Sequence, residues 1–99
     1  MRRAFIYFWD PSPGGNIEHV GDNNVTQEEF EEVTERGFAS RERSRAQPIR
    51  PNRWEVEDYT GDGTRYLIVI FELDDLREQN AWGITPVTAY EPEEPFTKG

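Results

Sequence analysis

The sequence predicts an α+β fold, a small antiparallel sheet of four to five strands with one main helix packed on one face. The strongest observation is an unbroken run of aromatic, β-branched and leucine residues, Tyr66–Phe71, bounded by Gly63 and Asp74. Such a run is typical of a strand that is covered on both faces. A single helix-start signal at Thr26 and several short, β-prone segments separated by glycine and proline complete the pattern.

The chain has 99 residues, which is enough for one small domain. We expect residues 1–92 to form that domain and residues 93–99 to be a loose C-terminal tail. The absence of cysteine excludes disulfides and thiolate metal sites. The chain has no apolar run of about 20 residues and no leader that resembles a signal peptide, so we expect no membrane segment and, by default, a cytoplasmic location.

The N-terminal part of the chain is predicted to hold one strand and a short helical turn. Ala4–Trp9 is aromatic and β-prone, and the proline and glycine cluster after it predicts a turn. Asn16–Val20 can form one helical turn, because the glycines and asparagines around it leave little length for more.

The clearest local signal is the start of the main helix. Thr26 is followed three residues later by Glu29, which predicts a capping box in which each side chain accepts a hydrogen bond from the other residue's backbone amide. Gly37 stands where a left-handed residue commonly ends a helix. We therefore predict a helix at about Gln27–Arg36, whose few apolar residues require the sheet to hold it in place.

The arginine-rich segment after the helix is predicted to be extended. Pro48 and Pro51 confine it to an edge strand or a loop. Three of its arginines alternate in the sequence, so a strand would place them on one face: Arg41, Arg43 and Arg45.

The next segment has the alternation of a half-buried strand. Trp54 and Val56 alternate with Glu55 and Glu57. The glycine-rich stretch Thr60–Thr64 predicts a turn into the central strand.

The central strand is predicted to return as an antiparallel hairpin. The polar loop Asp74–Asn80 is short, so Trp82–Glu91 is expected to pair with the central strand. Pro86 removes a backbone donor there and therefore indicates an edge position or a bulge.

The net charge of −9 is unevenly distributed. Residues 36–53 carry six arginines against Glu42, a local charge of +5, whereas residues 1–35 carry −6 and residues 54–99 carry −8. One interpretation is a solvated loop or edge strand. The other is a docking surface for an anion, either RNA phosphate or an acidic partner protein.

His19 is the only histidine, so any imidazole-based mechanism would use it. The alternative is that it caps or packs beside the helix. A single histidine among scattered carboxylates lacks the spacing of metal ligands, so we predict no metal site and no cofactor.

The order of several motifs is similar to that of BrnT-like proteins, relatives of the RelE-fold toxins of type II toxin–antitoxin systems. The motifs are Phe8-Trp-Asp10, Asn16-Ile-Glu-His-Val20, Val25-Thr-Gln-Glu-Glu-Phe-Glu-Glu-Val33, the segment Ser40–Pro48, Tyr59-Thr-Gly61, Thr64–Glu72 and Pro86-Val-Thr-Ala-Tyr-Glu91. The resemblance is strongest to a bacterial subgroup that ends in Val-Thr-Ala-Tyr-Glu. The chain departs from the family at Asn23, where BrnT toxins usually have a second histidine, and at Tyr90–Glu94, where their closing strand typically ends in a basic segment.

The resemblance implies a RelE/BrnT-like fold, a cognate antitoxin as partner, and metal-independent RNA cleavage. In that chemistry the 2′-hydroxyl of the RNA attacks the adjacent phosphate, while the protein supplies a base, an acid and cations. The predicted catalytic residues are His19 or Glu72 as base, Tyr90 as acid and Arg65 as a phosphate-stabilising cation. The predicted RNA- or partner-binding residues are Arg41, Arg43, Arg45, Arg50 and Arg53.

Two other functions are consistent with the same residues. The first is a non-catalytic interaction module that binds an acidic partner through its arginine-rich segment. The second is a self-associating domain that pairs through an exposed edge strand, which leaves the oligomeric state open and includes a homodimer.

Overall fold

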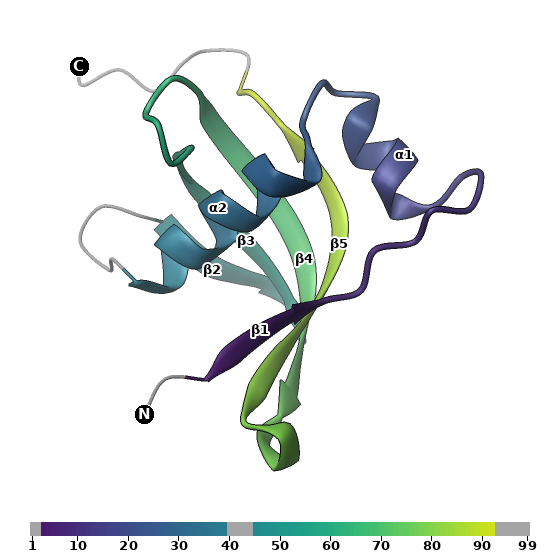
Figure 1. The fold of residues 1–99 in the computed structure, drawn as a ribbon. Coiled ribbons are helices and arrows are strands. Elements are labelled where there is room, and N and C mark those ends of the chain that lie inside the picture. The colour runs from purple at the N-terminus through teal and green to yellow at the C-terminus, as the bar shows by residue number, and fades with distance from the viewer. Residues whose placement is uncertain (1–2, 40–44, 93–99) are drawn as a thin grey trace.

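The computed structural model describes residues 3–39 and 45–92 and confirms the α+β class (Figure 1). Five strands form one sheet, and two helices pack against one of its faces. In chain order the elements are β1 (Ala4–Tyr7), α1 (Asn16–Gly21), α2 (Gln27–Ala39), β2 (Arg45–Arg50), β3 (Arg53–Tyr59), β4 (Tyr66–Leu76), a 3-10 turn (Arg77–Gln79) and β5 (Ala81–Tyr90). The predicted tail, residues 93–99, lies outside the described residues.

The strand order is β1-β5-β4-β3-β2, and β1 runs parallel to β5, whereas the other neighbouring strands are antiparallel. The prediction of an antiparallel sheet is therefore wrong at the first strand. The reason is that α1 and α2 carry the chain over one face of the sheet, which lets the strand before them join the last strand in the same direction. Side-chain alternation reports which face a residue is on and does not report strand direction.

The core lies between α2 and the face of the sheet that it covers, which we call the helix-covered face. Phe30 and Val33 of α2 are fully buried. The Phe30 ring packs edge-on against Phe71 of β4, with centroids 6.5 Å apart, and against Trp9 beyond β1, with centroids 5.3 Å apart. One side chain of α2 therefore contacts both the centre of the sheet and the segment that follows β1.

The predicted capping box at the start of α2 is confirmed. The Glu29 amide donates to Thr26 Oγ1 at 3.0 Å, and the Thr26 amide donates to Glu29 Oε1 at 3.1 Å. The predicted helix end is wrong, because α2 continues through Gly37 to Ala39. Gly37 does not have the left-handed backbone of a helix-ending residue. Gly37 is instead a point where the α2 backbone lies directly against β3, since a Cβ at Gly37 would lie 2.2 Å from Cγ1 of Val56.

The hairpin is longer than predicted. β4 extends to Leu76, so most of the predicted loop Asp74–Asn80 is strand or 3-10 turn. The bulge expected at Pro86 is confirmed, because Ile70 pairs with Thr88 while Phe71 pairs with Pro86. The bulge leaves one residue between Pro86 and Thr88 without a partner in the register. That residue belongs to β5, which is an inner strand.

Within residues 3–39 and 45–92, β4 is not covered on both faces as predicted. Both helices lie on the same face of the sheet (Figure 1), and we call the opposite face the open face. On the open face Ile68 is buried by its neighbours within the sheet, whereas Ile70 is only half-buried. Ile68 pairs with Glu57 of β3 on one side and with Tyr90 of β5 on the other. On this face the side chains next to Ile68 therefore come from neighbouring strands and not from a second layer.

Candidate functional site

The residues predicted to be catalytic are distributed over both faces of the sheet. Arg65 immediately precedes β4, and Glu72 lies seven residues further along it, about 23 Å away in an extended strand. The Arg65 guanidinium is on the helix-covered face, where it contacts Glu29 of α2. Tyr90 is on the open face, because it pairs directly with Ile68. The structure therefore does not bring Arg65, Glu72 and Tyr90 together.

His19 is exposed on α1, on the helix side of the sheet. Two asparagine side chains of this region fix α1 against β5. Asn16 Nδ2 donates to the carbonyl of Pro86 at 3.0 Å, and Asn23 Nδ2 donates to the carbonyl of Ala89 at 2.8 Å. These contacts join residues far apart in the sequence, which no local pattern predicts, and they give Asn23 a structural position.

Arg65 joins three parts of the chain. Its Nη1 donates to Glu29 Oε1 and to the carbonyl of Asn24, both at 2.8 Å, and its Nε donates to Glu91 Oε2 at 2.9 Å. The pKa of Arg65 is raised, and the largest cause is the hydrogen bond with Glu91. Burial lowers this pKa, and the hydrogen bond with Glu29 raises it. A guanidinium held by three acceptors in this way works as a clamp between the start of α2 and the end of β5.

The predicted base Glu72 is also part of an ion pair. Arg53 Nη2 donates to Glu72 Oε2 at 2.7 Å, and the two residues face each other across β3 and β4. The same arrangement recurs through the described chain, where each arginine with a described side chain is paired to a carboxylate. These arginines are Arg3, Arg36, Arg53, Arg65 and Arg77.

The arginine-rich segment contributes β2, one of the two edge strands of the described sheet. β2 is the last strand in the order, as the two prolines predicted. Its backbone register places Arg45 opposite Glu57 and Arg50 opposite Arg53. Next to Arg50, the Ile49 side chain is 46% exposed. Arg41 and Arg43 lie outside the described residues.

The open face holds a group of tyrosine and glutamate side chains that sequence reasoning did not bring together. The alternation in β3 correctly predicted that Glu55 and Glu57 point away from the buried Val56. The register then places Tyr59 opposite Tyr66 and Glu57 in one row with Ile68 and Tyr90. A sequence shows the alternation within each strand, but only the pairing of strands shows which residues become neighbours.

Comparison of the chain with protein families, with curated proteins and with solved structures found no match. The relation to BrnT-like toxins therefore stays a prediction.

The described residues contain no group of three histidine, cysteine, aspartate or glutamate side chains placed to hold a metal ion. Within the same residues no helix has the length and apolar character needed to cross a membrane.

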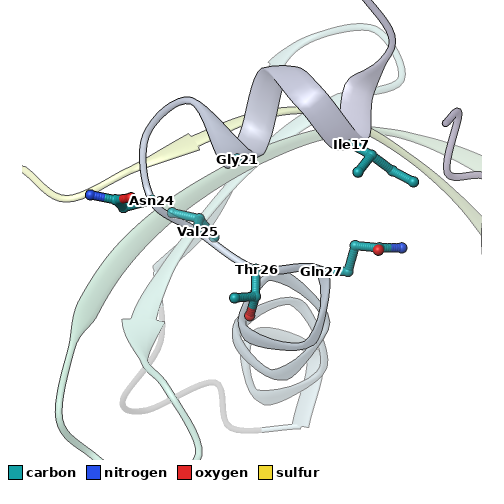
Figure 2. A pocket seen from close by; sticks show the side chains of 6 residues that line it. All are labelled: Ile17, Gly21, Asn24, Val25, Thr26 and Gln27. Atoms are coloured by element: carbon teal, nitrogen blue, oxygen red, sulfur yellow. The ribbon is translucent and has the colours of Figure 1, made fainter. Parts of the chain in front are cut away.

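An open cleft of about 380 Å³ lies between α1 and the start of α2 (Figure 2). Its lining residues are Ile17, Gly21, Asn24, Val25, Thr26 and Gln27. None of these side chains ionises near neutral pH, so the cleft supplies neither an acid nor a base. The Thr26 hydroxyl is already used by the capping box.

Proposed function

We propose that the protein is a non-catalytic protein-interaction module that binds an acidic partner along β2. The observation that carries the proposal is that β2 is an edge strand of the described sheet and contains both Arg45 and Arg50. An edge strand presents backbone donors and acceptors to a further strand. Arginines on such a strand add attraction for carboxylates of the incoming chain. Following the BrnT-like resemblance, we propose an antitoxin-type protein as the partner.

The choice of an interaction module over a ribonuclease is supported by how the other arginines are used. RNA cleavage needs free cations close to an acid and a base on one surface. Arg65 is instead held by Glu29 and Glu91, and Arg53 by Glu72. The predicted acid Tyr90 is on the open face, away from Arg65.

The β2 proposal predicts weaker binding when its arginines are removed. The probe is a ten-residue peptide of alternating glutamate and valine, titrated by NMR at low salt. We expect Arg45→Ala and Arg50→Ala each to weaken binding about threefold, the effect of losing one exposed ion pair. Amides of β2 are expected to become protected from hydrogen exchange as the peptide adds to the edge.

The matched control is Arg77→Ala, which removes the same charge from an exposed arginine far along the chain in the turn before β5. It should leave the affinity unchanged. Equal weakening by all three variants, or increased aggregation of the β2 variants with unchanged affinity, would contradict the proposal. The second result would mean that the arginines only protect the edge from self-pairing.

Arg65→Ala separates a structural role from a catalytic one. We expect it to lower the free energy of unfolding by about 2 kcal/mol, because it removes a partly buried cation bonded to two carboxylates. Purified wild-type protein is expected to leave RNA intact in EDTA, as is the variant. RNA cleavage by the wild type that disappears in a folded Arg65→Ala variant would instead establish the ribonuclease.

A further inference from the structure

We infer that Ile49 is the apolar anchor of the β2 interface, so that the acidic segment bound there carries one large aliphatic residue that covers it. This inference rests on the proposed function, because it names a residue of the same surface and the chemistry of its partner. Charge alone would accept any acidic segment, whereas an apolar anchor selects among acidic segments.

Ile49 is exposed at an edge of the sheet. It is 46% exposed. A single exposed aliphatic residue is common on protein surfaces and does not by itself indicate an interface. Ile49, however, lies in the edge strand to which we assign the partner. A strand that adds to β2 passes beside Ile49 and can remove its apolar surface from water.

A β-bulge fixes the place of Ile49 relative to an incoming strand. The partners of two consecutive β3 residues are Pro48 and Arg50 of β2, so Ile49 is the extra residue. The regular pairing of β2 with β3 therefore ends at Pro48, which has no backbone N–H to donate to a further strand. Backbone pairing of the partner thus ends before Ile49, and Ile49 contributes through its side chain.

The hairpin that carries Ile49 is held to the rest of the sheet. The turn between β2 and β3 contains Asn52, whose backbone is left-handed with φ 68°, a conformation that asparagine tolerates better than most residues. The carbonyl of Asn52 accepts a hydrogen bond from the Leu73 amide at 2.7 Å. The ion pair of Arg53 with Glu72 joins the next residue to the same strand. Ile49 is therefore presented by a supported backbone, which lowers the entropy cost of binding through it.

The occupant that fits is an acidic segment with one large aliphatic side chain. Residues 36–53 carry a net charge of +5, which favours carboxylates on the partner. An aliphatic side chain gains free energy when it covers the exposed part of Ile49. A carboxylate or phosphate at the same place would lose water without gaining a hydrogen bond. RNA would therefore gain nothing from Ile49.

The test compares two ten-residue peptides by NMR titration at low salt. One alternates glutamate and threonine, and the other has leucine in place of one central threonine. We expect the leucine peptide to bind the wild type about fivefold more tightly, the effect of burying the exposed part of one isoleucine. In Ile49→Thr the two peptides should bind equally, with the affinity for the threonine peptide unchanged, because threonine keeps the branched Cβ and removes apolar surface. Ile49→Val keeps most of that surface and should retain a preference for leucine.

Ile6→Thr is the matched control, because Ile6 is 38% exposed on β1, the other edge strand. It should keep the fivefold preference for the leucine peptide. The amide spectrum of each variant confirms that it is folded. A preference that persists in Ile49→Thr would overturn the inference, because the leucine would then contact another part of the protein. Loss of the preference in both variants would also overturn it, because apolar surface in general would then be responsible.

Failure of the inference can be distinguished from failure of the proposed function. If both peptides shift the amides of β2 with equal affinity, and Arg45→Ala weakens both, the β2 interface stands and the anchor at Ile49 is overturned. If neither peptide shifts the amides of β2, the proposed function fails and the inference fails with it.

Discussion

Phe30→Ala is expected to lower the free energy of unfolding by about 3–5 kcal/mol, a large share of the roughly 5–15 kcal/mol typical of small domains. Phe30 is fully buried, and its ring contacts both Trp9 and Phe71. Its removal leaves a cavity and also breaks two edge-on aromatic contacts, each of which stabilises by about 0.5–1.5 kcal/mol beyond burial. Urea unfolding followed by tryptophan fluorescence measures the change.

Phe30→Leu and Glu28→Ala are the controls for this prediction. Leucine keeps most of the buried volume but not the ring contacts, so its cost should be clearly smaller than that of alanine. Glu28 is exposed on the same helix, and its replacement should change stability little. If Phe30→Ala cost less than about 1 kcal/mol, α2 would not be held to the sheet through this side chain. The sheet that carries β2 would then lack the support that we describe.

Features determined by neighbours in sequence could be predicted from the sequence. The capping box depends on two residues three positions apart, and both of its hydrogen bonds are present. The burial of Val56 and the outward direction of Glu55 and Glu57 follow from alternation in one strand. The edge position of β2 follows from the missing backbone donor of Pro48.

Features determined by contacts between distant segments could not be predicted. The pairing of Arg53 with Glu72 requires the register of β3 on β4. The ion pairs of Arg65 require the start of α2 and the end of β5 to lie close together. From the sequence alone these arginines were equally suited to bind phosphate. Their carboxylate partners are 19 and 26 residues away in the chain, so the sequence could not show that these charges are neutralised within the molecule.

The same limitation explains the position of the candidate sites. The stretch with a local charge of +5 is predicted as a site from the sequence, because the residues of a charge cluster can be neighbours in the chain. The tyrosines and glutamates of the open face come from three strands, and no single stretch of sequence contains them. Their grouping depends on the bulge in β5, since regular alternation of side chains from Pro86 onward would place Tyr90 on the helix-covered face.

Gly37→Ala is the second substitution for which we expect a large loss of stability. In the interior of a helix this change normally stabilises by about 1 kcal/mol. Here the new methyl group would lie 2.2 Å from Cγ1 of Val56, which is itself fully buried in β3. Overpacking of this kind costs about 1–3 kcal/mol, and the severity of the overlap favours the upper end. We therefore expect a net loss of about 2 kcal/mol in urea unfolding.

A double-mutant cycle with Val56→Ala identifies the cause of that loss. Val56→Ala alone should destabilise the protein by leaving a cavity. In that background the methyl group at position 37 occupies the cavity, so Gly37→Ala should become neutral or stabilising. Gly21→Ala serves as the control glycine, because a Cβ there meets no atom within 4 Å. If Gly37→Ala were as well tolerated as Gly21→Ala, the close contact between α2 and β3 would be wrong.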